Sequence, residues 1–318
     1  MKKLLTVMLV LALVLPVFAN GSKESASAPA KAGWLPEKDV QCIIPFAPGG
    51  GSDLLTRAIM KYVDLNGHTM VGVNVDGGSG LLGAEQAADA KADGYTILAH
   101  NAMNILGNGL SGVSDVWEDL VPLGFVVTDW NCLFTNKESG IKSVDDLVAY
   151  AKKNPGKLKW GLTNAAITVA DSKRAMAGLG IDCTIVPYNG GADSITALLG
   201  DHIQLLLATG SECKAYIESG DFVPLFAIGT ERCPVIPNTP TLKELGVAVD
   251  DSNPRGYYAP KGTPDEAVQF YSKMLKDICE NPAFLKDLEN IGFTCVYVSA
   301  DDANAQQLSW YEGLKPYF

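Results

Sequence analysis

The 318-residue sequence contains few arginines and histidines. It has only four arginines and three histidines, and its formal net charge is −11. Proteins bind a phosphate backbone through clustered basic side chains, so the negative net charge argues against a nucleic-acid partner. It also means that any site for an anion has to be built locally, against a negative overall field.

Closely spaced cysteines are also absent. None of the seven cysteines is in a CxxC pair, the spacing typical of zinc and redox motifs. We therefore expect no metal site and no cofactor. Export would permit disulfides, but a chain of this size does not require them, and buried free thiols are the preferred interpretation.

No apolar run reaches the roughly 20 residues that a membrane-spanning helix needs. The run at residues 4–18 follows Lys2 and Lys3 and ends near the small residue Ala19, which is typical of a signal peptide over residues 1–19. We expect a periplasmic protein, and not a lipoprotein, because no cysteine lies near the cut. Removal of the signal peptide takes away two lysines and moves the net charge of the protein from −11 to −13. Residues 20–35 are predicted to form a flexible tether.

The most informative segment is a glycine-rich loop. Apolar residues 42–44 predict a buried strand, three glycines follow at 49–51, and Ser52 and Asp53 open a predicted helix. Glycines leave amide N–H groups uncovered, and the start of a helix is the positive end of its dipole. The segment therefore predicts a carboxylate site. The alternative is that Ser52 and Asp53 only cap the helix.

Backbone amides could supply enough affinity without an arginine. A ligand with a dissociation constant of ~1 μM needs about 8 kcal/mol. Each hydrogen bond to a charged group contributes roughly 1.5–3 kcal/mol, so several amides aimed at one carboxylate suffice.

A second glycine-rich segment has GxGxxG spacing at Gly78, Gly80 and Gly83, between a predicted strand and a helix. An exported protein rarely meets NAD, and no acidic residue ends a following strand at the required distance. We therefore expect Gly78 and Ser79 to add amides to the same carboxylate site. Close packing of the helix on the strand is an equally favoured interpretation for Gly83.

Three later segments repeat the order of strand, polar loop and helix start. They are His100 with Asn101 and Asn104, residues 163–168, and residues 188–193. Ligands of open α/β sheets bind at the carboxyl ends of strands, so these loops are expected in one cleft. A purely structural role for His100 is equally favoured.

Strands and helices alternate along the whole chain, which predicts two mostly parallel sheets with helices on both faces. The predicted first domain comprises residues 36–132 and 256–318. The second comprises residues 133–255, so the chain crosses twice, near Leu133 and near Arg255.

The sequence resembles the solute-binding proteins of tripartite tricarboxylate transporters, the Bug family. Seven weak motifs occur in the family's order between residues 40 and 264. They are Pro45–Asp53 with Arg57; Asn74 to Ala84; Asp93–Leu98; Leu147 to Lys157; Val186–Gly191; Arg232 to Gly246; and Ala259–Pro264.

The resemblance implies a periplasmic binding protein of the second structural type, with two Rossmann-like α/β domains around a central ligand cleft. It implies a monomer that captures a small carboxylate (a di- or tricarboxylate, or an amino or keto acid) and delivers it to a large and a small membrane subunit. Val75 and Asp76 replace the family's usual Arg-Pro, which puts citrate-like ligands in doubt. Asp193 is at a position where the family commonly has proline. Its side chain is expected either to cap the helix or to recognise an amine of the ligand.

Two other functions remain open. The same capture could serve a membrane receptor that senses the acid. A secreted enzyme would need a catalytic carboxylate pair, such as two of Asp53, Asp76 and Asp193, but the usual hydrolase, metalloprotease and nucleotide-binding motifs are absent.

The residues predicted to bind the ligand come from these loops. They are Pro48, Gly49, Gly50, Gly51, Ser52, Asp53, Gly78, Ser79, His100, Asn101, Thr163, Asn164, Ala165, Thr168, Tyr188, Asn189, Gly190 and Asp193.

Overall fold

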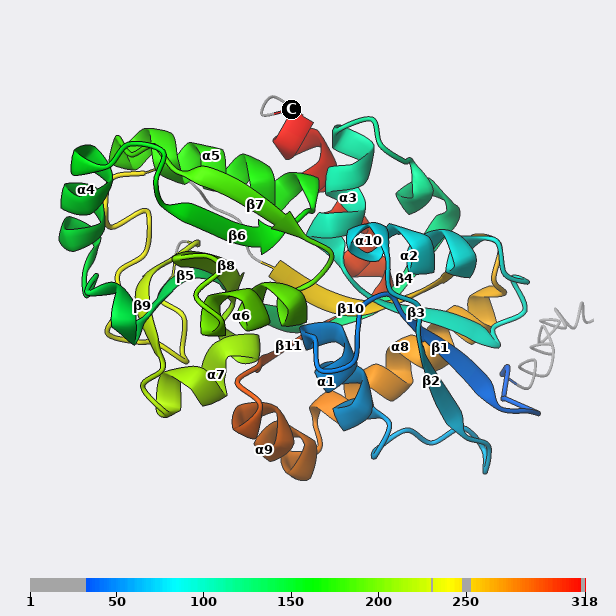
Figure 1. The fold of residues 1–318 in the computed structure, drawn as a ribbon. Coiled ribbons are helices and arrows are strands. Elements are labelled where there is room, and N and C mark those ends of the chain that lie inside the picture. Colours follow the sequence, from blue (N-terminus) through cyan, green and yellow to red (C-terminus); the bar gives the residue numbers. More distant parts are fainter. Residues whose placement is uncertain (1–32, 230, 248–252, 316–317) are drawn as a thin grey trace, which may run out of the picture. The chain divides into compact units, whose positions relative to one another are not determined.

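The structure, a computed structural model, describes residues 33–229, 231–247, 253–315 and 318. The predicted signal peptide and residues 20–32 of the predicted tether lie outside this part of the chain. The described strands form two sheets, and helices cover both faces of each sheet (Figure 1). This confirms the predicted pair of α/β layers.

The first sheet has six strands in the order β11-β4-β10-β3-β1-β2. Its strands are β1 (Val40–Ile44), β2 (Met70–Asn74), β3 (Thr96–Asn101), β4 (Leu120–Asp129), β10 (Asn253–Pro260) and β11 (Thr294–Val298). The helices packed on it are α1 (Gly51–Ile59), α2 (Leu81–Ala88), α3 (Ala102–Leu110), α8 (Asp265–Cys279), α9 (Pro282–Asn290) and α10 (Ala300–Leu314). We call this sheet with its helices the first lobe.

The second sheet has five strands in the order β7-β6-β8-β5-β9. Its strands are β5 (Asn131–Asn136), β6 (Lys159–Thr163), β7 (Thr184–Tyr188), β8 (Leu205–Thr209) and β9 (Phe222–Ala227). Its helices are α4 (Val144–Lys153), α5 (Ala166–Leu179), α6 (Gly191–Leu199) and α7 (Gly210–Glu218). We call this sheet with its helices the second lobe. Short 3₁₀ turns complete the described elements: η1 (Gly78–Gly80), η2 (Val116–Asp119) and η3 (Lys137–Ser139).

Both sheets are mixed. Strands β1, β2 and β3 pair in parallel, whereas β10 and β11 run against their neighbours. In the second sheet β6, β7 and β8 are parallel and β5 is antiparallel to both of its neighbours. The prediction that the sheets are mostly parallel is therefore wrong, because the direction of pairing depends on distant parts of the chain and not on the alternation of strands and helices.

Each sheet is buried on both faces, so its central strands are apolar at successive positions. In β8, Leu205 and Leu207 pack on the face covered by α4 and α5, while Leu206 and Ala208 pack on the face covered by α6 and α7. This is the alternation of side chains expected along a strand. The rigid sheets fix the positions of the loops at their edges.

The chain changes sheet between Asp129 and Asn131, and again between Ala227 and Asn253. The domain boundaries at residues 132/133 and 255/256 stay a prediction, since strand membership alone does not define a domain. By sheet membership, β5 with Cys132 lies in the second sheet and Arg255 lies in β10 of the first.

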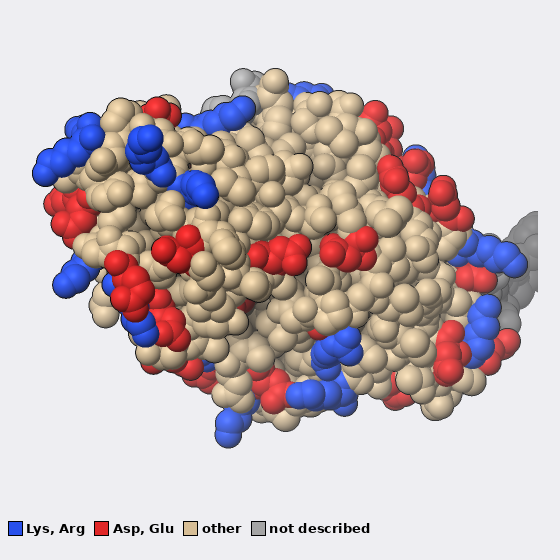
Figure 2. Space-filling view, in the orientation of Figure 1, with Lys and Arg blue, Asp and Glu red and all other residues tan. Residues whose placement is uncertain are grey.

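No helix in the described part of the chain is both long and apolar enough to cross a membrane. Acidic and basic side chains are interspersed on the face that Figure 2 displays, and the basic ones form no continuous patch on that face. All seven cysteines are free, and six of them are buried. No cluster of metal-ligating side chains occurs among the residues that the structure describes.

Candidate functional site

A pocket with a cavity of about 40 Å³ lies between the two lobes. The carboxyl ends of β1, β3, β6, β7 and β8 lead into it, as expected for ligand sites of α/β sheets. The reversed strands β5 and β10 bring their first residues to the same edge, including Asn131, Asn253 and Arg255. The pocket is therefore built from both sheets and from strand ends of both kinds.

Three helices begin at this pocket with an N-cap residue that provides no side-chain cap. The residues before α1, α5 and α6 are Gly50, Ala165 and Gly190, and none of them accepts a hydrogen bond through its side chain. The first N–H groups of a helix have no acceptor within the helix, and the helix dipole makes this end positive. One helix from the first lobe and two from the second thus direct N–H groups toward a shared space, which suits an anion.

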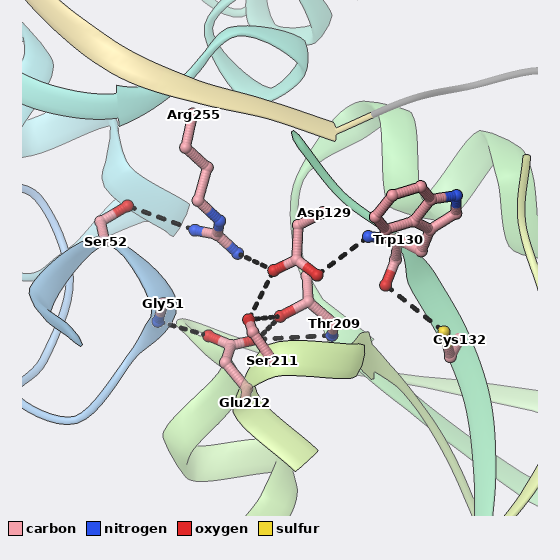
Figure 3. A network of polar contacts seen from close by, with 9 residues as sticks. All are labelled: Gly51, Ser52, Asp129, Trp130, Cys132, Thr209, Ser211, Glu212 and Arg255. Atoms are coloured by element: carbon pink, nitrogen blue, oxygen red, sulfur yellow. Dashed lines mark hydrogen bonds and ion pairs between the residues drawn. The ribbon is translucent and has the colours of Figure 1, made fainter. Parts of the chain in front are cut away.

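Arg255 provides a buried positive charge in the wall of this pocket and is 5% exposed. Its guanidinium donates to Ser52 Oγ at 3.3 Å and lies 3.6 Å from Asp129 Oδ2 (Figure 3). It also lies directly against the start of α1, since a Cβ built on Gly51 would be 2.6 Å from its Cζ. Arg255 fits there because residue 51 has no side chain.

The pocket therefore contains an arginine, although backbone amides alone were expected to supply the affinity for a carboxylate. Asp129, which faces Arg255, also accepts from Ser211 Oγ at 2.5 Å. Burial, only partly opposed by Arg255 and Ser211, raises the pKa of Asp129 above its ordinary value. The guanidinium balances one buried carboxylate and keeps further N–H groups for a ligand.

A second carboxylate, that of Glu212, lies at the start of α1. Its Oε1 accepts from the N–H of Gly51 at 2.8 Å, and its Oε2 accepts from Thr209 Oγ1 at 2.8 Å (Figure 3). Its Oε2 also accepts from Thr209 N at 3.4 Å, and this backbone contact belongs to a capping box at the start of α7. Glu212 is thus a residue of the second lobe that binds the glycine loop of the first.

Asp53 supports the loop from within. Its carboxylate accepts from Gly49 N at 2.9 Å, from Arg57 Nε at 2.9 Å and from Asn74 Nδ2 at 3.0 Å. Burial alone would raise the pKa of Asp53, but the hydrogen bonds from Arg57, Gly49 and Asn74 lower it overall. Asp53 therefore folds the loop and does not line the pocket.

The second glycine-rich segment lies behind the pocket wall. A Cβ on Gly83 would be 2.7 Å from Pro45 Cβ, and one on Gly80 would be 2.7 Å from His100 Nε2. These distances favour the interpretation that these glycines serve close packing. Gly78 and Ser79 do not line the pocket among the described residues.

His100 is a buried neutral side chain. Its Nδ1 accepts from Asn101 N at 2.7 Å, and its ring packs edge-on against Phe46, which lines the pocket. Burial disfavours the charged imidazolium and lowers the pKa of His100 to about 3. His100 supports the wall through Phe46.

The structure brings together seven of the residues predicted to bind the ligand. Those lining the pocket are Gly50, Gly51, Asn101, Thr163, Thr168, Gly190 and Asp193. The others lie in the same loops without lining it: Pro48, Gly49, Ser52, Asp53, Gly78, Ser79, His100, Asn164, Ala165, Tyr188 and Asn189. Ligand contact by any of them stays a prediction. Asp76 is exposed, and neither it nor Asp53 lines the pocket with Asp193.

Sequence reasoning missed Arg255, Glu212, Asn131 and Asn253. The scarcity of arginine singled out Arg255, but only as a point where the chain crosses between domains. Thr209 and Glu212 have the spacing of a capping box after an apolar strand, which signals a helix start at a strand end. Asn131 and Asn253 begin reversed strands, so a search of carboxyl ends alone could not find them.

Residues 61–309 match the family TctC, the tripartite tricarboxylate transporter family receptor. Protein BugT of Bordetella pertussis is 28% identical over 284 residues, which cover 86% of each chain. The periplasmic binding protein BugD has a similar structure, with a TM-score of 0.78 and 26% identity over 89% of this chain and 98% of BugD. Rpa4515 of R. palustris, solved with adipate, shares the fold at a TM-score of 0.81 and 24% identity, over 89% of this chain and 96% of Rpa4515. The match over residues 61–309 shows that the chain belongs to the TctC family of transporter receptors.

Proposed function

We propose that this protein captures a small carboxylate in the pocket between its two lobes and delivers it to a tripartite membrane transporter. The observation that carries the proposal is that three helices whose own N-cap residues provide no side-chain cap begin beside the buried guanidinium of Arg255. An ionised carboxylate only accepts hydrogen bonds, and these groups only donate them. The pocket is therefore complementary to an organic acid.

The charges that line the pocket favour a ligand with few carboxylates. The pocket also contains the carboxylates of Asp193 and Glu212, which add negative charge beside a single arginine. A short mono- or dicarboxylate, or an amino acid whose amine meets Asp193, fits these charges better than citrate does.

The family supports delivery to a transporter. TctC proteins are transport receptors and not enzymes, and BugD is a periplasmic binding protein. We propose that this chain acts as a monomer in the periplasm after removal of residues 1–19. Closure of the two lobes around the acid would present it to the large and small membrane subunits.

Isothermal titration calorimetry with a panel of short acids tests the proposal. The panel contains mono- and dicarboxylates, adipate among them, with adipamide as a matched ligand that lacks charge. We expect at least one acid to bind with a dissociation constant near ~1 μM, or about 8 kcal/mol, and adipamide not to bind. Mass spectrometry of the purified protein would identify an acid that it retains. If no acid binds and none is retained, the proposal is wrong.

A further inference from the structure

Glu212 occupies the position that the helix starts create for an anion. Its Oε1 accepts from Gly51 N at 2.8 Å, at the beginning of α1. A Cβ built on Gly191, the first residue of α6, would lie 2.7 Å from Oε1 and 2.8 Å from Oε2 of Glu212. The carboxylate therefore lies between the starts of two helices, one from each lobe.

This contact links segments far apart in the chain, because Gly51 and Glu212 are 161 residues apart in sequence. Within its own lobe Glu212 needs only to complete the capping box with Thr209, and glutamine serves in capping boxes as well as glutamate. The negative charge is therefore not required by α7. It matches the positive end of α1 instead.

We propose that Glu212 is an internal carboxylate that competes with the ligand for the start of α1. This inference rests on the proposed function, since it assumes that an acid enters the same pocket. A carboxylate ligand reaches the N–H of Gly51 only when Glu212 swings aside, and Glu212 then keeps its contacts with Thr209. Glu212 thereby lowers affinity and excludes ligands that bind the helix start more weakly than a carboxylate does.

Calorimetric titration of the Glu212→Gln variant with the acids of the panel tests the competition. Glutamine retains the cap of α7 and the size of the side chain but removes the charge. We expect its dissociation constant for a bound acid to fall at least tenfold relative to the wild type, or about 1.4 kcal/mol. Glu218→Gln is the matched control, because Glu218 is on the same helix with a 67% exposed side chain, and it should leave affinity unchanged.

The outcomes separate the two proposals. If the wild type binds an acid and Glu212→Gln binds it equally or more weakly, Glu212 is not a competitor, although the carboxylate site stands. An equal gain in affinity for Glu218→Gln would mean that net charge is responsible, and would also overturn the inference. If only Glu212→Gln binds, the competition holds, and the proposal that the wild-type protein captures an acid of the panel is wrong. If neither protein binds any acid, the carboxylate site itself is wrong and the competition is wrong with it.

Discussion

Arg255 is the one residue on which both the stability and the chemistry of the pocket depend. It is buried beside Asp129 and Ser52, and it lies against the backbone of Gly51. A buried ion pair adds little net stability, but removal of one partner leaves the other charge uncompensated. This asymmetry makes Arg255 open to a direct test.

We expect Arg255→Gln to lower the free energy of unfolding by about 3–5 kcal/mol at neutral pH and to abolish ligand binding. The pKa of Asp129 is already raised by burial, and the loss of Arg255 raises it further. A carboxyl whose folded-state pKa exceeds its unfolded-state value favours folding at low pH, and this stability is lost as the pH rises through the folded-state pKa. Urea unfolding should therefore show a larger defect at pH 8 than at pH 5.

The double variant Arg255→Gln with Asp129→Asn is the control. It removes the uncompensated charge, so it should recover most of the stability without recovering ligand binding. A single variant that is as stable as the wild type at pH 8 would contradict this account of the pair.

The burial of His100 gives a second prediction for a single residue. Its pKa is lowered by burial from 6.5 to about 3, so the imidazole is neutral in the folded protein and becomes charged in the unfolded chain below about pH 6.5. Stability is therefore lost as the pH falls from 6.5 toward 3, by at most about 1.4 kcal/mol per pH unit. His100→Asn keeps an acceptor near Nδ1 and should flatten the dependence measured by urea unfolding between pH 6 and pH 4.5. An unchanged slope would refute a buried neutral His100.

The start of helix α1 is close to Arg255 and Glu212 because its first residue has no side chain. Its first residue, Gly51, has contacts with both Arg255 and Glu212. A Cβ on the preceding Gly50, which is extended (φ −73°, ψ 163°), would make only ordinary contacts with its neighbours. Two neighbouring glycines thus have different physical roles.

Gly51→Ala would put its Cβ within 2.6–2.9 Å of the Arg255 guanidinium. Overpacking of this kind costs typically 1–3 kcal/mol, and the displaced guanidinium should also weaken ligand binding. Gly50→Ala is the matched control, since its nearest neighbours would be 3.4–3.8 Å away. We expect the control to be nearly neutral by urea unfolding. Equal effects of both substitutions would show that the guanidinium does not need a glycine at residue 51.

Elements that depend on local pattern could be predicted from the sequence. The strand, glycine loop and helix at residues 40–59 are local, and so are the helix starts near Ala165 and Gly190. The reversed strands were not predictable in this way, since a strand's direction is set by partners such as β3 and β4 for β10. Arg255 and Glu212 were missed for the same reason, as they reach the pocket only through tertiary structure.

Burial of the thiols can be tested on the whole molecule. Burial raises the pKa of Cys183 to about 11 and that of Cys42 well above its ordinary value, so these thiols are inert toward a disulfide reagent. Cys295 is only partly buried, and a hydrogen bond with Cys279 lowers its pKa. We expect the reduced native protein to expose about one reactive thiol to Ellman's reagent and all seven after denaturation. Rapid reaction of several thiols in the native state would contradict this packing.

The passage from β4 to β5 consists of one residue, Trp130, although the two strands belong to different sheets. Two successive peptide units reach only about 7 Å, so the sheets can swivel at this point but cannot slide apart there. Asn131, which follows, lines the pocket, and the pivot of any swivelling motion therefore lies at the edge of the pocket. Groups beside a pivot move little when the lobes turn, so an acid bound there can keep its contacts with both lobes. The indole of Trp130, next to Gly229, is suited to report the turn through its fluorescence.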